Sequence, residues 1–175
     1  SEGFHAAKTY LQLTWQDDKV PDVELPKGFS LRSFRLGQDE DALTRLQNES
    51  FRQNWGFCPN TVEEISARVR LKRCEPEGII FVVNEGRLSA YNWTFRVSAE
   101  AGSTGWIAMT GVHPDYRGRG LGKAAVVAGM EYLRIQKRVE GIELEVDSEN
   151  APAMDIYREL GFREVRRATW YEKSQ

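Results

Sequence analysis

The chain has 175 residues, 41% of them hydrophobic, and its 24 Lys and Arg against 26 Asp and Glu give a net charge of −2 at pH 7. This composition is typical of one globular domain that buries about 70% of the surface of its unfolded chain, and it excludes collagen-like and low-complexity classes. The near-neutral balance and the pI near 5.8 argue against a general nucleic-acid or membrane-surface binder.

The residues before position 113 predict an antiparallel arrangement. Residues 29–34 alternate apolar and polar side chains, as a strand does, and Leu43 and Leu46 share a helical face. Thr61 and Glu64 form a capping box, because each side chain can accept from the backbone N–H of the other. In chain order the predicted elements are a strand at 29–34, a helix at 39–51, a helix from 61, a hairpin of 78–83 and 88–97, and a strand at 106–112.

The pattern changes after residue 112. A helix at 121–138 follows, then a strand at 142–147, a helix opened by Asn150 and closed by Gly161, and two short strands at 162–164 and 166–173. The strand, helix and strand from 106 to 147 form a parallel βαβ unit. The predicted fold class is therefore α+β, a mixed and mostly antiparallel sheet flanked by helices.

The glycine-rich loop from Arg117 to Lys123 lies between the predicted strand and helix. Glycines let several backbone N–H groups turn toward one point, and the start of a helix adds positive potential. Six basic and two acidic residues between Asp115 and Arg138 also concentrate positive charge here. This segment predicts a diphosphate site.

Two familiar phosphate motifs fit the loop poorly. A kinase-like phosphate loop needs Gly at position 117 and Ser or Thr after Lys123, but Arg117 and Ala124 stand there. Residues 120–125 do match the dinucleotide pattern G-x-G-x-x-A. However, over 100 residues precede this match and about 50 follow it, which is too few to complete a doubly wound sheet.

Two segments resemble the GNAT superfamily of acetyl-CoA-dependent N-acetyltransferases. Residues 111–122 resemble its cofactor motif R-x-x-G-x-G/A with the strand before it, and residues 144–162 resemble the strand and helix that follow. Both occur in the family's order, and the predicted elements from 29 to 173 agree with its fold. The resemblance implies acetyl-CoA as acetyl donor. It also implies the cofactor-binding residues Val112, Arg117, Gly118, Arg119, Gly120, Leu121, Gly122, Lys123 and Asn150.

The resemblance also implies roles in catalysis. Tyr157 matches the tyrosine that protonates the departing thiolate, and the Thr110 backbone amide matches the group that faces the thioester carbonyl. Glu145 resembles in spacing the glutamate of ribosomal-protein alanine acetyltransferases. A carboxylate there can act as base directly or through water. The alternatives are that Tyr157 is a core aromatic and that Glu145 is a solvent-facing strand residue like Glu143.

The other reactive residues are weaker candidates for a catalytic role. Ala108 stands where some family members place a base, so that candidate base is absent. We interpret His113 as a loop residue and Cys58 as inert, and the sequence has no metal-ligand cluster. The two cysteines allow at most one disulfide, which favours a reducing, cytoplasmic compartment. Trp55 and Phe57 lie where the family forms its acceptor wall, although both can also be core residues.

The first residues suggest an internal repeat. Gly3-Phe4 followed by Thr9-Tyr10 echoes Gly161-Phe162 followed by Thr169-Trp170. We therefore expect residues 1–27 to be an N-terminal extension or linker from an earlier GNAT copy, with the acetyltransferase domain at 28–175. The tandem arrangement, together with residues 29–59, resembles the mycothiol synthase group.

The predicted function is acetyl transfer from acetyl-CoA to a primary amine by direct attack. A small-molecule acceptor is favoured over a protein, with no nucleic-acid or membrane partner, and a preceding GNAT domain is an expected neighbour in the native chain. One alternative is a non-catalytic acetyl-CoA-binding half of a tandem protein. A more remote one is a nicotinamide-dependent oxidoreductase.

Overall fold

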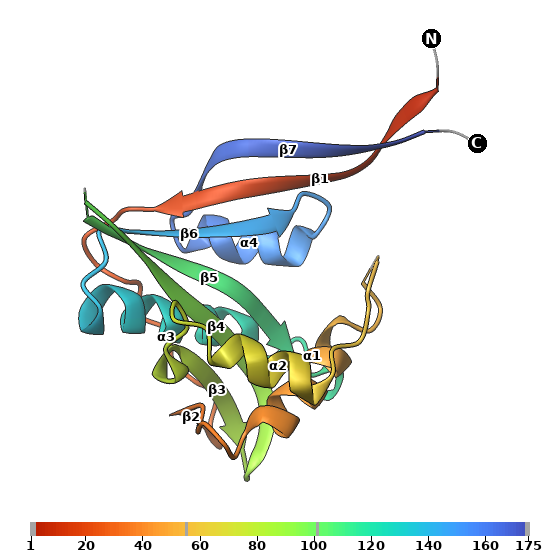
Figure 1. The fold of residues 1–175 in the computed structure, drawn as a ribbon. Coiled ribbons are helices and arrows are strands. Elements are labelled where there is room, and N and C mark those ends of the chain that lie inside the picture. The colour runs from red at the N-terminus through yellow and green to blue at the C-terminus, as the bar shows by residue number, and fades with distance from the viewer. Residues whose placement is uncertain (1–2, 55, 101, 174–175) are drawn as a thin grey trace.

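The computed structural model describes residues 3–54, 56–100 and 102–173, and it has helices on both faces of a seven-stranded sheet (Figure 1). The strand order is β2-β3-β4-β5-β6-β1-β7. The strands are β1 (Phe4–Trp15), β2 (Phe29–Ser33), β3 (Ile79–Asn84), β4 (Arg87–Ala99), β5 (Gly102–Val112), β6 (Gly141–Asp147) and β7 (Arg163–Lys173). The α-helices are α1 (Glu40–Phe51), α2 (Val62–Val69), α3 (Leu121–Glu131) and α4 (Ala151–Glu159), and shorter turns are η1 (Pro76–Gly78), η2 (Pro114–Tyr116) and η3 (Tyr132–Gln136).

One strand pair is parallel, as the sequence predicted. β5 and β6 pair in parallel from Thr104 opposite Gly141 to Ile107 opposite Leu144, and every other pair is antiparallel. The predicted α+β class with one parallel βαβ unit is confirmed. Beyond Ile107 the two strands separate, and Figure 1 shows them diverging toward their C-terminal ends.

A β-bulge lies at the point of separation. Met109 is opposite Trp93 and Ile107 is opposite Thr94, so Ala108 has no partner of its own in β4. Such an extra residue bends its strand and increases the local twist. The bulge therefore turns residues 109–112 away from β6 while they stay paired with β4.

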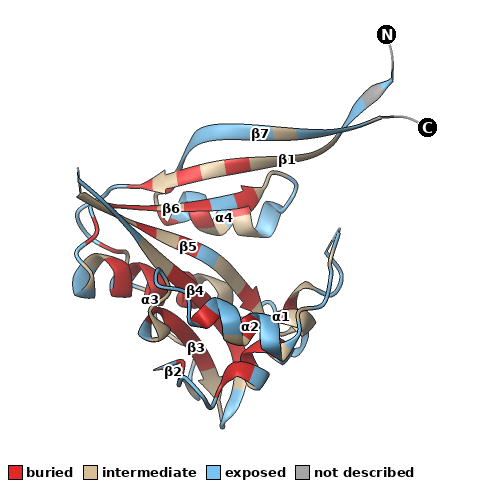
Figure 2. Cartoon of the chain, viewed as in Figure 1, coloured by how far each residue is buried: buried red, intermediate tan, exposed pale blue. Residues whose placement is uncertain are grey.

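The sheet has a hydrophobic core on each face. Side chains of α1 and α2 pack with Phe81, Tyr91 and Trp93 on one face, while α3, α4 and β1 pack with Ile80 and Ile107 on the other. Residues 80 and 81 point to opposite faces because side chains alternate along a strand. Figure 2 shows the central strands and α3 among the most buried parts of the chain, and residues 124–130 of α3 are all buried.

The predicted helix starts are confirmed by their hydrogen bonds. Thr61 Oγ1 accepts from the Glu64 N–H at 3.2 Å, and Glu64 Oε2 accepts from the Thr61 N–H at 2.8 Å, which completes the capping box of α2. Asn150 Oδ1 accepts from the Ala153 N–H at 3.3 Å at the start of α4. These bonds satisfy backbone groups that have no partner inside the helix.

The helix predicted for 121–138 ends early. α3 stops at Glu131, and residues 132–136 form the π-helical turn η3. Tyr132 Oη donates to Glu75 at 2.6 Å, and Lys137 pairs with the same carboxylate. A widened turn lets two side chains five residues apart reach one partner, a long-range contact that helical periodicity does not reveal.

The closing strands also differ from the prediction. Residues 163–173 form one strand, β7, with a shifted register against β1, where two short strands were expected. β1 lies between β6 and β7 and pairs with both, so residues 4–15 are part of this sheet. The origin of residues 1–27 in an earlier copy stays a prediction. In the described part of the chain no helix has both the length and the apolar character to span a bilayer.

Because β1 buries one face in the core, truncating an inward side chain should destabilise the fold. Leu13 is 2% exposed, and Leu13→Ala should lower the free energy of unfolding by about 2–5 kcal/mol through lost packing and a cavity. Thr14→Ala, on the opposite face of β1, is the matched control. Urea unfolding of both variants measures this, and equal small losses would show that β1 does not pack in the core.

Candidate functional site

A cavity of about 490 Å³ lies between the end of β5, the loop before α3 and α4. Its walls are apolar along Val112, Leu121 and Ile156. The loop glycines and Lys123 form its other side. The cavity therefore combines an apolar channel with one strongly polar end. Its lining residues are Thr110, Val112, Tyr116, Arg117, Gly118, Gly120, Leu121, Gly122, Lys123, Val126, Asn150, Pro152, Ala153, Ile156 and Tyr157.

The polar end is made by the backbone of the glycine-rich loop. Gly118 and Gly120 both have φ of +76°, a conformation that L side chains rarely adopt. Gly120 immediately precedes α3, whose first N–H groups have no carbonyl partner within the helix. N–H groups and the positive end of the helix dipole together favour a bound anion such as a phosphate.

Basic side chains surround this loop in different ways. The Arg117 guanidinium donates to the Ser50 carbonyl at 2.9 Å, which connects the loop to α1. Lys123 pairs with Glu159 of α4 at 2.7 Å. Arg119 places its guanidinium 5.3 Å from the centre of the Tyr116 ring and does not line the cavity. The loop backbone thus presents the N–H groups that favour an anion, and Arg117 and Lys123 connect this region to α1 and α4.

A second cavity of about 590 Å³ opens on the other side of the separated strands. Four residues line both cavities: Thr110, Asn150, Ala153 and Tyr157. These side chains therefore form the wall at which a ligand in one cavity meets a ligand in the other. The remaining lining residues are Lys8, Tyr10, Phe51, Asn54, Ile107, Ala108, Met109, Glu145, Val146, Asp147 and Glu149.

Tyr157 is held in this wall by packing. It is 8% exposed, and its ring lies edge-on to Phe162 with the ring centres 5.7 Å apart. Burial raises the pKa of Tyr157, and the neighbouring Thr110 side chain lowers it by a smaller amount. The phenol is therefore protonated at neutral pH and can donate a hydrogen bond or a proton into the site.

The second cavity carries excess negative charge. Lys8 lies between Asp147 at 2.7 Å and Glu149 at 3.0 Å, and these carboxylates raise the pKa of Lys8, which stays cationic. Glu145 is exposed and lines the cavity, and it has no ionic partner among the described residues. One lysine against three carboxylates favours a cationic ligand.

The structure brings most of the predicted site residues together. All three predicted catalytic residues, Thr110, Glu145 and Tyr157, line the second cavity. Every predicted cofactor-binding residue except Arg119 lines the first. His113 accepts from the Asp115 N–H at 3.2 Å and lines neither cavity. Cys58 and Cys74 are free thiols.

Some lining residues were missed by the sequence analysis, and one predicted wall residue is not described. Lys8 and Tyr10 reach the second cavity because β1 pairs with β6, with Tyr10 opposite Asp147. The alternation of Leu11, Leu13 and Trp15 was the available signal for a half-buried strand. Trp55, an expected acceptor-wall residue, lies outside the described part of the chain, and Phe57 lines a smaller neighbouring cavity.

Comparison with known proteins places this geometry in a family. Residues 40–162 match the Acetyltransferase (GNAT) family. A mycothiol acetyltransferase of Arthrobacter sp. (strain FB24) is 35% identical over 155 residues, which cover 87% of this chain and 48% of that protein. The chain thus spans about half the length of this curated relative.

Solved structures agree. A GCN5-related N-acetyltransferase from Sphaerobacter thermophilus superposes with a TM-score of 0.79 at 26% identity, covering 97% of this chain and 52% of that one. A tandem GNAT protein of clavulanic acid biosynthesis, at 20% identity and a TM-score of 0.70, shares the fold over 96% of this chain and 54% of its own. Together with the separated strands and the glycine loop, these matches show that the chain belongs to the acetyltransferase (GNAT) family, a family of N-acetyltransferase enzymes.

Proposed function

We propose that this chain transfers an acetyl group from acetyl-CoA to a primary amine by direct attack. The observation that carries the proposal is the shared wall, where Tyr157 and Thr110 lie between the anion-binding cavity and the acidic cavity. A donor in the first and an amine in the second would meet at these two residues. No covalent enzyme intermediate is needed, because both reactants reach the same point.

The donor fits the first cavity in one orientation. The pyrophosphate would lie against the backbone N–H groups of Gly118 to Lys123, and the pantetheine arm along the β5 edge at Val112 that β6 leaves unpaired. This places the thioester beside Thr110, whose backbone N–H would stabilise the developing oxyanion. Asn150 and the start of α4 would border the arm on the opposite side.

The chemistry then requires a base and an acid. Glu145 would first remove one proton from the incoming ammonium, directly or through water. The amine nitrogen then attacks the thioester carbon, the carbon–sulfur bond breaks, and the thiolate takes a proton from Tyr157. The second proton that the nitrogen loses on becoming an amide passes to the tyrosinate and restores the phenol. An alkyl amine with a pKa of about 10.4 needs the help of a base more than an α-amino group with a pKa of about 7.7–8.0.

For the acceptor we propose a small cationic amine rather than a protein. The carboxylates of the second cavity and its volume of about 590 Å³ support a molecule of this kind. The curated relatives named mycothiol acetyltransferase favour an acceptor of the mycothiol type among such amines. We also propose that the native protein carries a preceding GNAT repeat, because the chain spans about half of those relatives.

The ligand test compares two pyrophosphate-containing cofactors. Coenzyme A should raise the melting temperature of the chain and NAD should not, since only coenzyme A has an arm that can pair along β5. Acetyl-CoA with a panel of aminothiol sugar, aminoglycoside and peptide amines should then release free thiol. Stabilisation by NAD alone would support an oxidoreductase, and coenzyme A binding without turnover would support a non-catalytic binding half.

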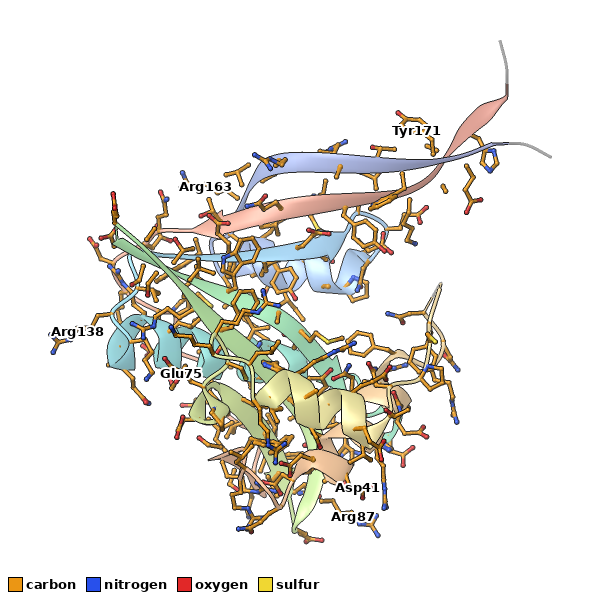
Figure 3. All side chains as sticks on the ribbon, viewed as in Figure 1. Asp41, Glu75, Arg87, Arg138, Arg163 and Tyr171 are labelled. Atoms are coloured by element: carbon orange, nitrogen blue, oxygen red, sulfur yellow. The ribbon has the colours of Figure 1, made fainter. Side chains whose placement is uncertain are left out.

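Replacing the proposed acid should reduce turnover without weakening the cofactor complex. Tyr157→Phe keeps the ring against Phe162 but removes the hydroxyl, so kcat should fall by about 100-fold while the Kd of coenzyme A stays at the wild-type value. Tyr171→Phe is the control. Tyr171 lies on the part of β7 that extends beyond β6 (Figure 3). Equal rates for Tyr157→Phe and wild type would reject the acid role.

Replacing the proposed base should give a pH-dependent defect. Glu145→Gln should lower kcat/KM for an alkyl amine by about 100-fold at pH 7, and the deficit should narrow toward pH 10 as the amine loses its own proton. Glu143→Gln makes the same charge change on the same strand and face but does not line the cavity. Steady-state rates across this pH range measure both variants, and equal deficits in the two would contradict the assignment.

A further inference from the structure

The Thr110 side chain lies between two polar groups at the shared wall. Asn92 Nδ2 donates to Thr110 Oγ1 at 2.8 Å, and Thr110 and Tyr157 lie together in the wall that both cavities share. The three residues come from β4, β5 and α4. A hydrogen bond from the centre of the sheet therefore ends on the residue that neighbours the proposed acid. This connection is separate from the role proposed for the Thr110 backbone N–H.

Asn92 is tightly enclosed. It is fully buried, at 0% exposure, and lies directly opposite Thr110 in the β4–β5 register. The backbone of α3 passes so close that a Cβ at Gly129 would lie 2.0 Å from Asn92 Oδ1. Only glycine leaves room for the amide there, so α3 fixes the carboxamide against β4 and aims its Nδ2 group at Thr110.

The chemistry of the three groups allows one direction of hydrogen-bond donation, from Asn92 through Thr110 to Tyr157. An amide Nδ2 group can only donate, so the Thr110 oxygen accepts from Asn92. The single Thr110 hydrogen is then free to point at the Tyr157 oxygen. Tyr157 in turn keeps its own hydrogen for the group in the cavity. Hydrogen bonds arranged head to tail in this way polarise one another.

We propose that Asn92 and the Thr110 hydroxyl are positioning groups, which hold the Tyr157 hydroxyl toward the thioester and donate to its oxygen as it loses its proton. The inference rests on the proposed function and adds two residues to it. The Thr110 hydroxyl is thus most important after the acid has acted, when a buried phenolate oxygen needs a donor. Substrate binding should not depend on the Thr110 hydroxyl.

The test is a double-mutant cycle of Thr110→Val and Tyr157→Phe. Thr110→Val keeps the shape and the backbone N–H, and it should lower kcat by about tenfold, as for one lost hydrogen bond, with KM for acetyl-CoA unchanged. In the Tyr157→Phe background the same change should have no further effect on kcat. Thr110→Ser restores the hydroxyl and should recover most of the rate.

Two further variants separate positioning from stability. Asn92→Leu should lower kcat in the wild-type background but not in Thr110→Val. Thr94→Val removes another fully buried β4 hydroxyl, which donates to the Gly78 carbonyl at 2.7 Å away from both cavities. It should lower the melting temperature and leave kcat unchanged.

Urea unfolding of the wild type, the two single variants and the double variant tests the proposed hydrogen bond between Thr110 and Tyr157 independently of turnover. The losses in free energy of unfolding caused by Thr110→Val and Tyr157→Phe should not add, because each change removes the same interaction. Additive losses in stability, or additive losses in kcat in an active enzyme, would overturn the proposal. If the wild-type chain acetylates none of the amine probes, the proposed function is overturned, and the role of Asn92 and Thr110 is overturned with it.

Discussion

The site depends on the loss of pairing between β5 and β6. The two strands are hydrogen-bonded only as far as Ile107 and Leu144, and the bulge at Ala108 then turns β5 away. Buried strand edges normally satisfy each other's N–H and C=O groups. Here the edge of residues 108–112 is left without a strand partner among the described residues, and it faces a cavity. In the proposed function, an extended ligand arm would supply the hydrogen bonds that the missing strand would have made.

Once the strands separate, their surroundings give the two cavities opposite character. The first ends at a helix start with unpaired N–H groups, which favours an anion, whereas the second is lined by carboxylates of β6 and the loop that follows it. Tyr157 is buried between them, while Glu145 is exposed on the far side. The proposed acid is thus a buried phenol, and the proposed base is an exposed carboxylate.

β1 extends this arrangement in an unexpected way. By pairing between β6 and β7 it buries Leu11, Leu13 and Trp15 in the core beneath α3 and α4. Its other face brings Lys8 and Tyr10 to the second cavity. The same twelve residues therefore stabilise the sheet and contribute to the lining of the second cavity.

Local signals determined much of this protein from sequence alone. The glycine turn at 118–122, the capping box at Thr61 and the change from strand to helical periodicity after residue 112 depend on neighbouring residues, and these three local features match the structure. Contacts between distant residues were decided only by the tertiary structure. The π-turn at Tyr132 needs Glu75, the cavity wall needs β1 beside β6, and the hydrogen bond from Asn92 to Thr110 needs the β4–β5 register. Periodicity reports which face of an element is buried, but it does not report which distant residue packs against that face.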